Sequence, residues 1–124
     1  MQKPLIIDYY SDLLCVWAWI AQRRIDELNQ TLGDKIELRH IYVDIFGDVA
    51  GKMDKQWASR GGFSVFAKHV QYSASPFEHA PIHPKIWTEV KPSTSANAHL
   101  LLKAIELAFD KPTSINMALL LRTA

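Results

Sequence analysis

The sequence predicts an α/β fold in which a βαβ unit is followed by an all-helical region. Residues 5–10 form a short run rich in branched and aromatic side chains, which is typical of a buried strand. Residues 36–43 alternate apolar and polar side chains before becoming fully apolar, which also predicts a strand. Between them, from residue 16 to residue 28, apolar side chains recur at helical spacing. Two strands joined by one helix form a right-handed unit with parallel strands. We expect the first strand to be buried and to end in a turn at Ser11-Asp12.

After Phe46 the pattern contains no further strand. Residues 51–60 and 63–72 are predicted helices divided by Gly61-Gly62. Residues 73–92 contain four of the six prolines, which excludes a long helix there, although residues 85–90 can form a turn or two. We therefore divide the chain into residues 1–46, half of an α/β domain, and residues 47–124, a helical region.

Two later helices are predicted. The first covers residues 93–109, with a cap from Ser93, Thr94 or Ser95. Its apolar stripe consists of Ala98, Leu101, Leu102, Ile105 and Ala108. The second follows Lys111-Pro112, is capped by Thr113 or Ser114, and carries Met117, Leu120 and Leu121.

Composition narrows the classes of function. Fourteen Lys and Arg against thirteen Asp and Glu give a net charge of +1, which indicates neither nucleic acid nor an anionic membrane as a partner. No apolar run approaches the roughly 20 residues that span a bilayer. The first residues run into a strand without the pattern of a signal peptide. One cysteine excludes an internal disulfide and fits a reducing compartment, so we expect a cytoplasmic protein.

Cys15, the only cysteine, lies where the first strand passes into the first helix. Unpaired backbone N–H groups and the positive end of a helix dipole favour the thiolate at such a position. Cys15 is therefore placed where a reactive cysteine would lie. From its position alone the favoured interpretation is still an inert residue, because free cysteine often packs as a small hydrophobic side chain.

The stretch around Cys15 resembles the active-site segment of the DsbA-like branch of the thioredoxin superfamily. The residues that carry the resemblance are Ser11-Asp12, Cys15-Val16-Trp17-Ala18, Arg23-Arg24 and, later, residues 95–104. The branch includes FrnE-like proteins, 2-hydroxychromene-2-carboxylate isomerases and kappa-class glutathione transferases. The resemblance implies a thioredoxin fold interrupted by a helical domain after the second strand.

The motif departs from the oxidoreductase pattern Cys-Pro-Trp-Cys at two positions, Val16 and Ala18. Disulfide exchange by a dithiol enzyme needs a second thiol, which Ala18 lacks. Family members also continue with a hairpin, a last helix and a cis-proline loop facing the cysteine. Compared with them, this chain resembles a C-terminally truncated member.

The resemblance implies a catalytic role for Cys15 and places Trp17, Ser11 and His99 at the substrate cleft. It implies no cofactor, with glutathione as a co-substrate. His79 and His83 have the spacing of helical metal ligands, but Pro81 between them predicts loop histidines and no metal site.

The sequence is compatible with three functions. The first is a DsbA-family thiol-disulfide oxidoreductase homologue with Cys15 as its single redox group and its dithiol activity lost. The second is a glutathione-dependent isomerase or transferase of the related branch. The third is a non-catalytic truncated homologue that acts through oligomerisation. Expected partners are glutathione or protein thiols, and a second copy of the chain, because both edges of a two-strand sheet are unpaired.

Overall fold

The computed structural model describes residues 3–123 and shows a mixed α/β chain, as predicted. In chain order its elements are β1 (Leu5–Ser11), α1 (Val16–Leu32), a 3₁₀ turn η1 (Gly33–Lys35), β2 (Ile36–Tyr42), α2 (Val49–Gln56), a 3₁₀ turn η2 (Ala58–Arg60), α3 (Phe63–Ala74), a π-helical turn η3 (Ile86–Val90), α4 (Ala96–Ala108) and α5 (Lys111–Thr123). None of the helices within this part of the chain is long and apolar enough to cross a membrane.

The sheet consists of β1 and β2, which run parallel as the βαβ pattern predicts. Their register pairs Leu5 with Ile36 at one end and Ser11 with Tyr42 at the other. One further bond, from the Val43 N–H to the Ser11 carbonyl at 2.9 Å, continues the ladder. The carboxyl ends of both strands therefore meet at one edge, which is where chemistry is commonly placed in parallel sheets.

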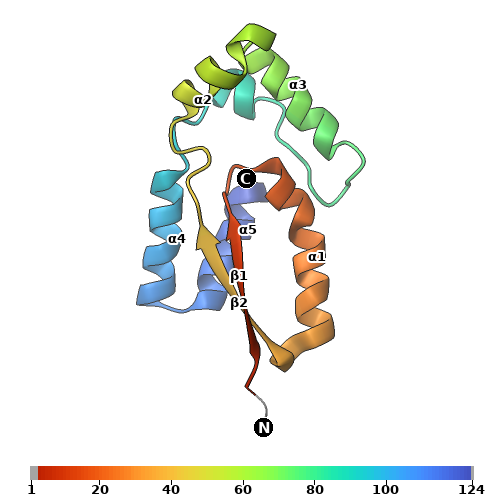
Figure 1. Cartoon of the computed structure of the whole chain (residues 1–124), viewed down its shortest axis with the longest axis vertical. Coiled ribbons are helices and arrows are strands. Elements are labelled where there is room, and N and C mark those ends of the chain that lie inside the picture. Colours follow the sequence, from red (N-terminus) through yellow and green to blue (C-terminus); the bar gives the residue numbers. More distant parts are fainter. Residues whose placement is uncertain (1–2, 124) are drawn as a thin grey trace.

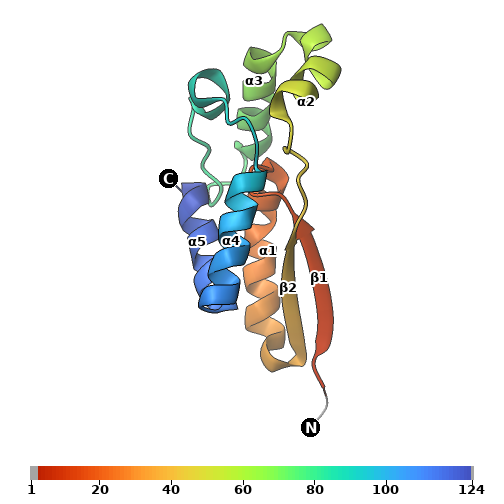
Figure 2. The ribbon, with the colours of Figure 1, turned by 90° about the vertical axis from the view of Figure 1, so that its left-hand side faces the viewer.

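The helices are distributed unevenly around the sheet. Helices α1, α4 and α5 lie beside the strands on one side, and β1 forms the outer margin (Figures 1 and 2). Helices α2 and α3 gather beyond the carboxyl ends of the strands (Figure 1). The His99 ring on α4 stacks on Tyr42 with centroids 4.8 Å apart, and Lys111 Nζ on α5 donates to Glu37 Oε1 at 3.2 Å. These contacts join the later helices to β2.

The hydrophobic core lies at the α2–α3 end of the molecule rather than under the sheet. Its buried members are Val16, Phe46, Val49, Met53, Phe66, Ala67, Val70, Ala74 and Trp87. Phe66 is central to it, because its ring lies 5.0 Å from those of Trp57 and Trp87 and 6.2 Å from that of Phe46. The first turn of α1, which follows Cys15, is thus anchored in the core through Val16.

The prediction that the first strand is buried is wrong. Leu5, Ile6 and Tyr10 are 67%, 50% and 60% exposed. Strand β1 has a partner at one edge only and helices on one side only, so alternate side chains face solvent.

The predicted apolar stripe of the 93–109 helix is also only partly correct. Leu102 is fully buried, but Leu101 and Ala108 are exposed, and Ser95 and His99 share the buried face with Leu102. These polar side chains are buried because each has a hydrogen-bond partner there. In α5, likewise, Ser114 and Ala118 are buried while Leu120 and Leu121 are exposed.

Glycines end two of the predicted elements. Gly33 follows α1 with a φ of 47°, as expected for a residue just past a helix end. Gly61 and Gly62 have φ values of 118° and 72° and separate η2 from α3. The predicted helix over residues 51–60 is therefore α2 followed by the short turn η2. The proline-rich segment contains the end of α3 and the short turn η3 but no long helix, in agreement with the prediction.

Replacing Phe66 tests the position of the core. Phe66→Ala removes a ring that contacts three other aromatic side chains, so the free energy of unfolding should fall by about 3–5 kcal/mol. Phe109→Ala is the matched control, since Phe109 is 74% exposed and its removal should change stability by about 0.5 kcal/mol or less. Urea unfolding followed by circular dichroism measures both. Equal losses in the two variants would contradict this position of the core.

Candidate active site around Cys15

Cys15 is the N-cap residue of α1, as the strand-to-helix pattern predicts. Its N–H donates to the Asp12 carbonyl at 3.1 Å, and its carbonyl accepts from the N–H groups of Ala18 and Trp19 at 3.1 and 3.2 Å. The side chain makes no capping hydrogen bond and is partly exposed. The sulfur is therefore left without a hydrogen bond at the N-terminus of α1.

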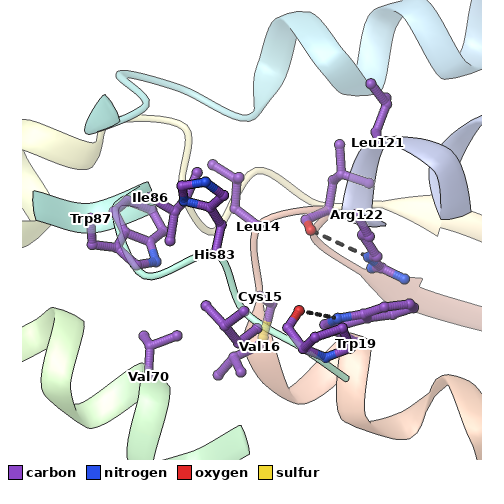
Figure 3. Close-up of a pocket in the computed structure, with 13 residues that line it drawn as sticks. Leu14, Cys15, Val16, Trp19, Val70, His83, Ile86, Trp87, Leu121 and Arg122 are labelled. Atoms are coloured by element: carbon purple, nitrogen blue, oxygen red, sulfur yellow. Dashed lines mark hydrogen bonds between the residues drawn. The ribbon is translucent and has the colours of Figure 1, made fainter. Parts of the chain in front are cut away.

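A small cavity of about 130 Å³ opens beside the sulfur (Figure 3). Its wall is mostly apolar and combines the β1–α1 turn, α1, α3, η3, the proline-rich loop and α5. The lining residues are Leu13, Leu14, Cys15, Val16, Trp19, Val70, Pro81, Ile82, His83, Ile86, Trp87, Leu121 and Arg122. A space of this size admits one end of a ligand rather than a whole cofactor.

The proline-rich loop is fixed against α1 and α3 by hydrogen bonds to backbone carbonyls. Trp19 Nε1 donates to the Pro81 carbonyl at 3.1 Å, and Gln71 Nε2 donates to the Ile82 carbonyl at 3.2 Å. His79 Nε2 lies 2.8 Å from the Ile20 carbonyl. The loop thus forms a fixed wall of the cavity. His79 and His83 are loop histidines, as predicted, and residues 3–123 contain no cluster of side chains suited to a metal ion.

The carboxylate of Asp12 holds the turn that presents Cys15. It is fully buried and accepts three hydrogen bonds. Oδ1 accepts from the Leu14 N–H at 2.8 Å, and Oδ2 accepts from the Phe46 N–H at 2.9 Å and from Ser95 Oγ at 2.7 Å. One side chain therefore joins the β1–α1 turn, the segment after β2 and the start of α4.

His99 supports the same turn from α4. Its Nε2 accepts the Leu13 N–H at 3.0 Å, so the ring carries its proton on Nδ1, which lies 2.7 Å from Asp44 Oδ1. The distance of 3.6 Å between Nε2 and Asp12 Oδ1 is too long for a hydrogen bond. His99 is buried and stacked on Tyr42. Successive backbone N–H groups before Cys15 are thus bound by two different side chains.

Arg122, in the last turn of α5, brings a positive charge to the cavity. Its Nε donates to the Leu13 carbonyl at 3.3 Å (Figure 3). Its Nη2 donates to the Asp12 carbonyl, also at 3.3 Å. Burial lowers the pKa of Arg122, and the nearby Tyr9, Tyr42, Cys15 and Asp12 partly offset that effect. Burial also raises the pKa of Tyr9, an effect that Arg122 partly opposes.

The structure brings only some residues of the predicted site to the cavity. Cys15 and Val16 line the cavity, and Ala18 is buried on α1. Trp17 is 54% exposed and belongs to a separate surface groove with Phe77 and His79.

The other two predicted residues, Ser11 and His99, are buried behind the cavity and do not line it. Ser11 is the last residue of β1. His99 contacts the lining of the cavity through its Nε2, which accepts a hydrogen bond from the Leu13 N–H. The predicted set is therefore divided between the cavity, its support and the surface.

Four residues of this site were not predicted as functional, namely Asp12, Asp44, Ser95 and Arg122. Asp12 was expected only as a residue of the turn. A signal existed for the two aspartates, because each follows the carboxyl end of a parallel strand. Ser95 was expected only as a helix cap, yet its hydroxyl donates to Asp12. Nothing in the local pattern of α5 marked Arg122.

Comparisons of the chain with protein-family models, with curated proteins and with solved structures find no match.

Asp12→Asn tests the role of the buried carboxylate. The amide nitrogen would face backbone N–H donors, so the free energy of unfolding should fall by about 3 kcal/mol or more. Asp48→Asn is the control, because Asp48 is an exposed N-cap of α2 and Asn caps equally well. Thermal and urea unfolding of both variants give the comparison. A stability loss of less than 1 kcal/mol in Asp12→Asn would contradict the proposed network.

Proposed function

We propose that the chain is a thioredoxin-like protein of the DsbA group whose Cys15 carries out one-thiol disulfide exchange. The main support is the placement of Cys15: a partly exposed sulfur at the N-terminus of α1, without a capping bond, beside a small apolar cavity. The parallel β1–α1–β2 unit followed by helices agrees with that group. The absence of a second cysteine agrees with a reducing compartment, and we propose the cytoplasm.

The proposed reaction exchanges one S–S bond for another. The Cys15 thiolate attacks one sulfur of a disulfide, a new S–S bond forms between Cys15 and that sulfur, and the old S–S bond breaks. The second sulfur leaves with the bonding electron pair and takes up a proton from solvent. Glutathione disulfide or a disulfide of another protein supplies the partner sulfur.

Ala18 determines the fate of the mixed disulfide at Cys15. It stands three residues after Cys15, where a dithiol enzyme has its second thiol, and its methyl group is buried. The mixed disulfide at Cys15 therefore persists until an outside thiol attacks it. A persistent mixed disulfide distinguishes this function from that of a dithiol reductase.

A glutathione-dependent isomerase or transferase is a second candidate, supported by the apolar wall of the cavity. Leu14, Trp19 and Ile86 offer contact to a small apolar substrate beside the sulfur. In such an enzyme Cys15 occupies the position where relatives commonly carry serine. Cys15→Ser distinguishes the two functions, since it should end disulfide exchange but should retain glutathione-dependent isomerisation, for which relatives commonly carry serine at this position.

Ala18→Cys provides the direct test of the leading proposal. The unmodified protein should form a stable adduct with glutathione disulfide, seen by mass spectrometry, and should not reduce insulin. Ala18→Cys should gain measurable insulin reduction, because a thiol three residues along the helix can attack the adduct. Cys15→Ser in the Ala18→Cys background is the control and should be inactive. Insulin reduction by the unmodified protein, or failure to form any adduct, would refute the proposal.

We propose in addition that two copies associate through the free edge of β1. The exposed side chains of Leu5, Ile6 and Tyr10 lie on this strand, whose outer backbone groups are unpaired in the sheet. An exposed apolar edge strand is a common template for pairing with another chain. A homodimer also agrees with the third function considered from the sequence, a non-catalytic protein that acts through oligomerisation.

Light scattering tests the dimer. The unmodified protein should have twice the mass of the chain at micromolar concentration, and Ile6→Lys should shift it to a monomer because a charge on an edge strand opposes pairing. Tyr72→Lys is the control, since Tyr72 is 80% exposed on α3, away from this edge. A monomeric unmodified protein would contradict the proposal without bearing on the chemistry of Cys15.

A further inference from the structure

Arg122 is a partly buried cation whose hydrogen bonds within residues 3–123 go to backbone carbonyls alone. Four Lys and Arg side chains of residues 3–123 form ion pairs with carboxylates, and each of the four is about half exposed: Arg39 with Asp8, Lys85 with Glu89, Lys103 with Glu106 and Lys111 with Glu37. Within the same part of the chain, Arg122 makes no ion pair with a carboxylate. Its contacts are the carbonyl oxygens of Leu13 and Asp12.

This arrangement is costly unless an anion faces the guanidinium. Removing a charge from water without a counter-ion is unfavourable, and neutral carbonyl acceptors offset only part of that cost. Within residues 3–123, these two bonds leave the remaining N–H donors of the guanidinium unused. The carboxylate of Asp12 is also close enough to act on the charge of Arg122, but its oxygens accept hydrogen bonds from Leu14, Phe46 and Ser95 and not from Arg122. Arg122 lines the same cavity as Cys15, so its charge faces any molecule that enters there (Figure 3).

We propose that Arg122 makes the Cys15 cavity selective for anionic partners, by attracting a negatively charged group on the molecule that reacts with Cys15. The inference rests on the proposed function, since it requires that Cys15 be a reactive thiol. Its content is separate, because a cysteine at a helix N-terminus can react without any preference for charge. The favoured partners are thiols and disulfides that carry a carboxylate or another acidic group close to the sulfur.

Two alkylating reagents that differ in charge measure this selectivity. Iodoacetamide is neutral and iodoacetate is an anion of nearly the same size. In both, the thiolate attacks the CH₂ carbon, a C–S bond forms, and iodide leaves with the electron pair of the broken C–I bond. A positive charge beside the sulfur raises the iodoacetate rate relative to the iodoacetamide rate. The ratio of the two rates therefore reports the local charge and cancels general effects on access.

In Arg122→Gln the ratio of iodoacetate to iodoacetamide rates should fall by about threefold or more, the scale of one partly screened charge pair. Arg122→Lys should retain most of the ratio, because it keeps the charge although it loses the planar pair of donors. Arg24→Gln is the matched control, since it removes the same charge from an exposed position on α1. Its ratio should equal that of the unmodified protein. Equal ratios in Arg122→Gln and Arg24→Gln would overturn the inference.

The unmodified protein supplies a second measurement that does not depend on how the variants fold. Raising the salt concentration from 0.01 to 1 M shortens the screening length from about 30 to about 3 Å. The ratio should fall across this range towards that of a free thiol such as N-acetylcysteine methyl ester. A ratio no higher than that of the free thiol at low salt would overturn the role of Arg122 alone. No reaction with iodoacetamide in the folded protein would overturn both this inference and the proposed function.

Discussion

The buried carboxylate of Asp12 is the interaction on which the site depends. It accepts hydrogen bonds from the backbone of the β1–α1 turn, from the segment after β2 and from the start of α4, so it joins three parts of the chain that lie far apart in the sequence. A buried carboxylate is stable only when its oxygens are fully bonded. The same requirement fixes Leu14, and therefore the position of Cys15 in the next peptide unit.

The position of Cys15 depends on this support as well as on the local sequence. His99 binds the Leu13 N–H, Asp12 binds the Leu14 N–H, and Arg122 binds the carbonyls of Leu13 and Asp12. Both N–H groups and carbonyl groups of the turn are therefore bonded to side chains. The sulfur itself makes no capping hydrogen bond at the N-terminus of α1. The apolar core at α2 and α3 fixes the helix itself through Val16.

Local patterns predicted the elements that depend on neighbours in sequence. Branched residues gave two parallel strands, helical spacing gave α1, and the junction between them placed Cys15 at a helix N-terminus. Contacts between distant residues could not be predicted in this way: Asp12 is 34 residues from Phe46 and 83 from Ser95, and Arg122 is 109 residues from Leu13. The face of α4 was misassigned for the same reason. An apolar stripe favours Leu101 inward, but the partners of Ser95 and His99 turn the polar face towards the sheet.

Native-state hydrogen exchange of the Leu14 and Phe46 amides tests the central claim, that one carboxylate joins these distant segments. In the unmodified protein both amides should be protected, and Asp12→Asn should accelerate the exchange of both together. The Gly51 amide, bonded to the exposed Asp48, serves as the internal reference and should be unchanged. Rapid exchange of Leu14 and Phe46 in the unmodified protein, or acceleration of one without the other in Asp12→Asn, would contradict the account.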